Sequence, residues 1–219
     1  YYLQFDLHPE KVIRGKDNRS GIFFIFWEQS FERLSGEGIG KNSSDFFFFF
    51  HTYLWVFLPW TILGIVAYYA KAKRLIKLKF KYNGKFEVLT LGGITLIFAV
   101  ISFAQFKLPH YLNITIPLFA VLTASYLYDL YRFENEKATR LLMKGQYFIL
   151  GIVFIASALI CFYVFELKSI VAYIFLIIAG VIIIFYALKR EGVYVRLITI
   201  SVCASLLLNA VLNLHFYPN

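Results

Sequence analysis

Residues 46–85 read FFFFFHTYLWVFLPWTILGIVAYYA followed by KAKRLIKLKFKYNGK, an apolar run that changes abruptly into a basic connection. A helix needs about 20 consecutive apolar residues to cross the hydrocarbon core of a bilayer. Cytoplasmic loops beside such helices carry an excess of lysine and arginine. The stretch therefore predicts a spanning helix over 46–70 whose basic end, residues 71–85, lies in the cytoplasm.

Five more apolar runs follow along the chain. Hydrophobic residues make up 60% of the 219 residues and charged residues only 16%, whereas soluble domains are roughly half apolar and about a quarter charged. The sequence therefore predicts an all-α fold, a polytopic transmembrane bundle of about six spanning helices. The predicted spans cover residues 46–70, 88–106, 111–128, 147–165, 170–188 and 197–214.

The basic residues predict one orientation for every connection. The connections 107–110 and 166–169 are tight hairpins, whereas basic residues at 132–144 and 189–196 fall on the same side as 71–85. The positive-inside rule then places both hairpins outside and the basic connections in the cytoplasm. A nucleic-acid partner is excluded for the net charge of +9, because the basic residues lie between apolar runs and not on a soluble face.

Residues 1–45 form a polar leader outside the membrane, before the bundle at 46–214 and an outer tail that starts at 215–219. Phe26, Trp27 and Phe31, with Leu34, have the spacing of a short helix that lies on the membrane surface. The chain begins without an initiator methionine. We therefore expect it to be part of a longer polypeptide.

The first hairpin tip gathers the groups best suited to chemistry. Lys107, His110 and Tyr111 supply a cation, an imidazole and a phenol at the outer interface. A lysine provides a point charge for phosphate, and the two rings can donate hydrogen bonds to phosphate or sugar oxygens. The alternative is that Lys107 only extends to the interface while its neighbours anchor the turn.

Two weaker candidates lie elsewhere on the predicted outer side. His51 is a lone histidine at the outer end of the first span, where packing is the commoner role unless a leader carboxylate reaches it. Glu28 and Arg33 belong to the leader, where a solvated amphipathic face explains them equally well. The sequence contains no phosphate-binding glycine loop, nucleophile elbow or zinc-ligand spacing.

Three stretches resemble a known family. They are WEQSFERLSGE at 27–37, HTYLWVFLPW at 51–60 and FKLPHY at 106–111. In this order they resemble the central to C-terminal part of bacterial membrane glycosyltransferases related to aminoarabinose transferase and protein O-mannosyltransferase. The Lys-Leu-Pro-x-Tyr tip is the most specific element. The chain departs from the family pattern after Tyr111, where a proline is common and Leu112-Asn113-Ile114 stands here.

The resemblance implies a multi-pass enzyme of the bacterial inner membrane. Such an enzyme passes a sugar from a polyprenyl-phosphate donor to a lipid, glycan or protein acceptor at the outer face. Carried over to this chain, it implies that Lys107 and Arg33 stabilise the departing phosphate. The family's catalytic aspartate lies in an earlier loop, so we expect it upstream of Tyr1, and a polar domain after Asn219. The further substrate-binding residues are Tyr111, His110, Glu28 and His51.

Two readings of other classes remain open, a transporter or flippase and a non-catalytic assembly subunit. The transporter reading is weakened because the middles of the apolar runs lack acids and bases. The donor sugar and the acceptor are not identified by these residues. A divalent metal ion is the only cofactor considered, and membrane lipids are the remaining expected partner.

Overall fold

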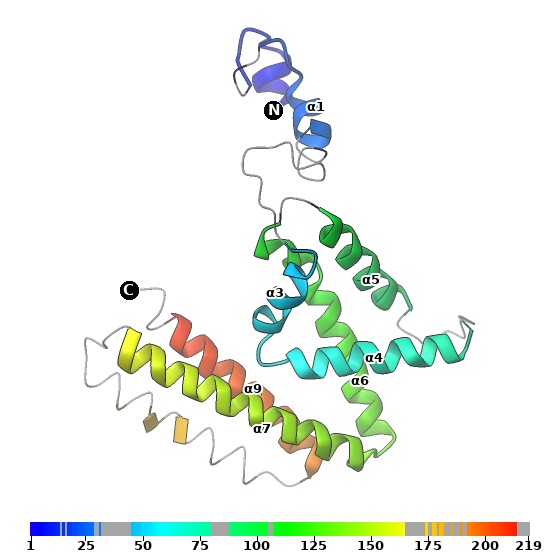
Figure 1. Ribbon diagram of the computed structural model, residues 1–219, viewed down its shortest axis with the longest axis vertical. Coiled ribbons are helices and arrows are strands. Elements are labelled where there is room, and N and C mark those ends of the chain that lie inside the picture. Colours follow the sequence, from blue (N-terminus) through cyan, green and yellow to red (C-terminus); the bar gives the residue numbers. More distant parts are fainter. Residues whose placement is uncertain are drawn as a thin grey trace. The chain divides into compact units, whose positions relative to one another are not determined.

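The computed structural model is helical, and the part of the chain that it describes contains no β-strand (Figure 1). This confirms the all-α expectation for that part. Arg33, most of the predicted span 170–188 and the tail 215–219 lie outside the described residues. The described residues are 1–13, 15, 17–28, 31, 45–79, 88–104, 107–164, 174, 177–178, 180–181, 185, 189 and 192–213.

The chain divides into two compact units. The first comprises residues 1–52 and 93–115, and the second comprises residues 53–92 and 116–219. The boundaries fall inside helices α3 (Phe48–Val56) and α5 (Val88–Phe103). The candidate site predicted at Lys107 belongs to the first unit.

The leader folds back on itself through short helical turns. These are η1 (Tyr2–Asp6), α1 (Gly21–Phe23) and η2 (Phe24–Glu28), of which η1 and η2 are π-helical. The Asp6 carboxylate accepts a hydrogen bond from the Gly21 amide at 2.9 Å. A side chain at Gly21 would place its Cβ 2.9 Å from the Tyr1 carbonyl oxygen, so this close approach requires glycine.

Aromatic contacts join the start of α3 to the end of α5 in the first unit. The rings of Phe46 and Phe103 lie 5.6 Å apart, and those of Phe50 and Phe98 lie 5.0 Å apart. The pairing runs in opposite directions along the two segments, so they are antiparallel neighbours. The 3-10 helix η3 (Pro109–Ile114) follows α5 and begins at a proline, whose fixed backbone angle suits a first helical position.

Four of the described helices surround an apolar core in the second unit. They are α4 (Thr61–Lys77), α6 (Ile116–Arg132), α7 (Glu136–Leu159, continued by the π-helical turn η4, Ile160–Val164) and α9 (Val193–Val211). Each helix contributes to one buried cluster because its apolar positions recur on one face. The cluster contains Leu63, Leu127, Leu130, Leu142 and Leu197.

Helices α7 and α9 lie side by side and run in the same direction (Figure 1). Near their starts, Thr139 and Val193 line one cavity, and further along both helices Gln146 donates to Ser201 at 3.0 Å. Both helices are long and apolar enough to cross a membrane, by length and composition. Helix α5 is apolar but shorter, at 16 residues.

The helix boundaries differ from several of the predicted runs. The run 46–70 is not one helix, because α3 ends at Val56 and α4 begins at Thr61. Pro59 lies in the break, where it has no amide to donate and disfavours helix at the residue before it. Helix α7 begins at Glu136, well before 147, because the Asn135 side chain caps it by accepting from the Ala138 amide at 3.2 Å.

Candidate functional site

Lys107 is the best-defined residue of the hairpin tip. It lies between the end of α5 and the start of η3, and it is only 4% exposed. Its ammonium donates a hydrogen bond to the backbone carbonyl of Asp45 at 3.0 Å. Asp45 stands just before the phenylalanine run, so this bond joins the tip to the start of α3.

The two rings of the tip lie on η3, which begins two residues after this lysine. His110 is exposed, and its ring meets that of Tyr111 edge to face, with centroids 4.9 Å apart. The Tyr111 hydroxyl is buried and has no hydrogen-bond partner among the described residues. The Ser102 hydroxyl, in the last turn of α5, is also buried without a hydrogen-bond partner among these residues. The tip therefore combines a buried ammonium with two buried hydroxyl groups that can still donate.

The other predicted site residues do not join this group in the part of the chain that the structure describes. His51 is exposed on α3, and no leader carboxylate contacts its ring there. Glu28 forms an ion pair with Arg19, a partner that the sequence did not suggest. Arg33 lies outside the described residues. Among the residues at the tip, the structure shows the His110 and Tyr111 rings in contact and Lys107 bonded to the Asp45 carbonyl.

A second polar centre in the second unit was not anticipated from sequence. The Lys71 ammonium contacts the Asp129 carboxylate at 2.7 Å and the Ser125 hydroxyl at 3.0 Å. Arg74 lies 3.8 Å from the same carboxylate. The only sequence signal is the acid itself, since an aspartate at the end of an apolar run is costly unless a cation reaches it. This centre holds α4 against α6.

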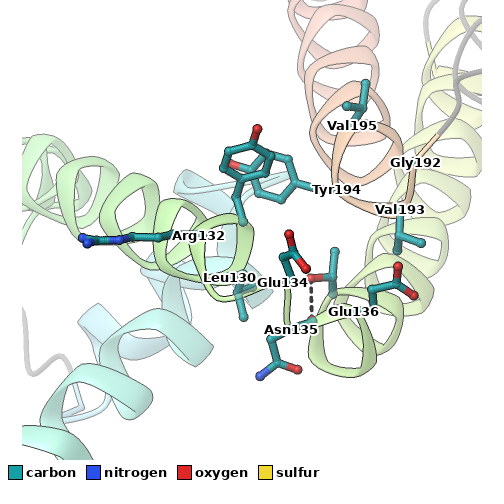
Figure 2. Close-up of a pocket in the computed structure, with 11 residues that line it drawn as sticks. Leu130, Arg132, Glu134, Asn135, Glu136, Gly192, Val193, Tyr194 and Val195 are labelled. Atoms are coloured by element: carbon teal, nitrogen blue, oxygen red, sulfur yellow. Dashed lines mark hydrogen bonds between the residues drawn. The ribbon is translucent and has the colours of Figure 1, made fainter.

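A cavity of about 560 Å³ opens where the end of α6 meets the starts of α7 and α9 (Figure 2). The rings of Tyr131 and Tyr194 lie 5.0 Å apart on its wall. Glu134 and Glu136 also line it, and Figure 2 shows the Arg132 side chain directed away from the other labelled residues.

Hydrogen bonds perturb the pKa of Asp6 in the leader. The Ser20 hydroxyl, together with the backbone amides of Ile22 and Gly21, holds the pKa of Asp6 below its usual value. These donors stabilise the charged form. Asp6 thus closes the leader fold and is ionised at neutral pH.

The described residues contain no group of three histidine, cysteine or acidic side chains that could hold a metal ion. The residues of the hairpin tip are instead suited to an oxyanion, because each of them offers a proton or a positive charge. The chain matches no family model, no curated protein and no solved structure.

Proposed function

We propose that this chain is part of a bacterial inner-membrane glycosyltransferase. It would pass a sugar from a polyprenyl-phosphate donor to a lipid, glycan or protein acceptor at the outer face. The observation that carries this proposal is the buried Lys107 ammonium, four residues before Tyr111, whose buried hydroxyl is unsatisfied. The second support is the resemblance of FKLPHY at 106–111 to the bacterial membrane glycosyltransferases.

The proposed chemistry assigns leaving-group stabilisation to the tip. When the bond between sugar and phosphate breaks, negative charge develops on the phosphate oxygens. A cation already fixed in a poorly hydrated site stabilises that charge without reorganisation. Lys107 supplies the cation, and Tyr111 and His110 donate hydrogen bonds. Arg33 is the proposed second cation, with Glu28 and His51 at the edge of the site, while the base that activates the acceptor comes from outside this stretch.

The membrane arrangement is part of the same proposal. Six crossings would leave the leader and the tip outside and the basic connections in the cytoplasm. Two observations in the second unit support it: α7 and α9 have the length of spans, and α4 and α6 place Lys71, Arg74 and Asp129 together near their ends. Reporter fusions after Lys107 and Lys77 should therefore report opposite compartments, and a shared compartment would contradict the arrangement.

The leader would rest on the outer membrane surface. Phe23, Trp27 and Phe31 are exposed, and successive rings in this series lie 6.4 and 4.6 Å apart. Aromatic rings of this kind are favoured at the boundary between lipid and water. This supports a leader that stays close to the tip during transfer.

The test uses the full-length protein with a labelled polyprenyl-phosphate sugar donor. Lys107→Met should lower transfer by about 100-fold, the usual loss when one stabilising group is removed from a developing oxyanion. Lys107→Arg should keep part of the activity, and Lys77→Met serves as the matched control because Lys77 is an exposed lysine on α4. Normal transfer by a correctly inserted Lys107→Met protein would rule out the proposal. Lipid translocation without transfer would favour the flippase reading.

A further inference from the structure

Several hydroxyl groups on the described helices follow one rule. Thr52, Thr123, Thr139, Ser201 and Ser205 each donate to the carbonyl oxygen four residues earlier, at distances from 2.7 to 3.0 Å. This local bond satisfies a hydroxyl group that lies in apolar surroundings. A helix hydroxyl that does not make it must find another partner or remain unsatisfied.

Ser102 breaks this rule. It is 3% exposed, and its hydroxyl has no hydrogen-bond partner in the described part of the chain. A buried hydroxyl without a partner is costly, and native proteins contain few of them. The Ser102 hydroxyl is therefore a candidate to bind a group that comes from outside the chain.

The position of Ser102 indicates what that group is. Ser102 lies five residues before Lys107, and Tyr111, whose hydroxyl is also unsatisfied, lies four residues after it. Along the chain, two hydroxyl donors therefore bracket one buried ammonium, with Ser102 in the last turn of α5 and Tyr111 on η3. Donors around a cation complement an oxyanion with several acceptor oxygens.

The third unsatisfied hydroxyl has a different explanation. Tyr53 belongs to the second unit, and its oxygen lies 2.2 Å from the point where a Cβ on Gly64 would stand. Close packing against a glycine accounts for its position. Among the described residues, such packing is not seen for Ser102 and Tyr111, which belong to the first unit together with Lys107.

We propose that Ser102 is a hydrogen-bond donor to the phosphate of a lipid, in the same site as Lys107 and Tyr111. This rests on the proposed function and adds a residue to its binding site. A lipid is favoured over free phosphate because Phe103, next to Ser102, is 73% exposed and pairs with the ring of Phe46. Exposed rings beside the donors offer a surface along which an isoprenoid chain can lie.

The test is a binding measurement on the full chain in detergent, with farnesyl phosphate and inorganic phosphate as the two probes. Ser102→Ala should weaken farnesyl phosphate binding by about tenfold, as expected for one lost hydrogen bond to a charged group. Ser102→Thr keeps the hydroxyl and should restore most of the affinity. Ser157→Ala is the matched control, since Ser157 is a buried serine on α7, in the other unit.

The outcomes separate this inference from the proposed function. Unchanged binding by Ser102→Ala, in a protein where Lys107→Met binds poorly, would overturn the role of Ser102 alone. Equal affinity for both probes would overturn the assignment to a lipid. Binding that depends on Ser102, in a wild-type protein that transfers no sugar, would support the inference and count against the transferase.

Discussion

Two lysines of similar burial sit in different surroundings in the two units. The Lys71 side chain is 10% exposed and meets the Asp129 carboxylate, which cancels its charge. Lys107 is 4% exposed, and its ammonium donates to the Asp45 backbone carbonyl. The first contact ties two helices together, whereas the second ties the tip to the residue just before the phenylalanine run. Burial alone therefore does not distinguish the two lysines, which differ in the contacts that they make.

The largest expected effect is on stability when Lys71 is replaced by methionine. Breaking a buried ion pair from one side costs about 3–5 kcal/mol, because the other charge is stranded. The loss here should be smaller, since the Asp129 side chain is 29% exposed. Thermal unfolding in detergent measures it.

Two companion variants sharpen this contrast between the lysines. The double variant Lys71→Met, Asp129→Leu should recover most of the stability, because no charge is left unpaired. Lys107→Met removes a hydrogen bond to a carbonyl and should lower the midpoint less than Lys71→Met. Equal losses for the two single variants would remove the distinction between the lysines.

The next effect concerns the unsatisfied hydroxyl of Tyr53, which we attribute to packing, whereas we attribute those of Ser102 and Tyr111 to binding. Gly64→Ala should destabilise the protein by about 1–3 kcal/mol through overpacking, since its Cβ would lie 2.2 Å from the Tyr53 oxygen and 2.8 Å from the Phe57 ring. Tyr53→Phe removes that oxygen, so it should be neutral or stabilising alone and should relieve part of the Gly64→Ala defect. Gly151→Ala is the control, because nothing lies within 4 Å of its Cβ position.

A smaller effect concerns Gln146, the buried amide that joins α7 to α9. It is 1% exposed and donates to the Ser201 hydroxyl at 3.0 Å. Hydrogen bonds between helices in membranes average about 0.6 kcal/mol in double-mutant cycles. We expect a coupling of that size from Gln146→Leu, Ser201→Ala and the double variant, measured by unfolding. A coupling near zero would mean that the second unit does not depend on this polar contact.

The smallest effect is the pH dependence of the leader. Because the pKa of Asp6 is lowered in the folded leader, its contribution is fully present above the ordinary aspartate pKa. The contribution is lost as the pH falls through the lower, folded value. Hydrogen exchange at the Gly21 and Ile22 amides measures this contribution. The wild-type protein should protect these amides more than the Asp6→Asn variant does, and this difference should shrink below about pH 4. A difference in protection that does not change with pH would contradict the role of the Asp6 carboxylate as the acceptor for these amides.

Local patterns predicted the helical class well and long-range partners poorly. The apolar run at 197–214 corresponds to α9, and the run at 88–106 to α5, within a few residues. The helix break at Pro59 was not predicted, because the apolar composition of the run 46–70 was given more weight than the proline within it. The contact between Lys71 and Asp129 joins residues 58 apart, and no spacing rule reaches that far.

The residues grouped at the tip come partly from the sequence and partly from the structure. The sequence identified Lys107, His110 and Tyr111 from residue types in one hairpin. It could not identify Ser102 or Asp45, because an ordinary helix serine and a main-chain carbonyl carry no compositional signal. Only geometry shows that the Ser102 hydroxyl is not satisfied by its own helix.

The shared direction of α7 and α9 has a consequence for how the protein is made. Two neighbours that point the same way cannot meet through a single tight turn, and Gln146 is 55 residues from Ser201. During synthesis, α7 is complete long before its partner leaves the ribosome. The Gln146 amide therefore has no Ser201 partner until α9 is synthesised, and water or another protein must satisfy it in the meantime. Assembly of the second unit is a late event that depends on the last helix of the chain that the structure describes.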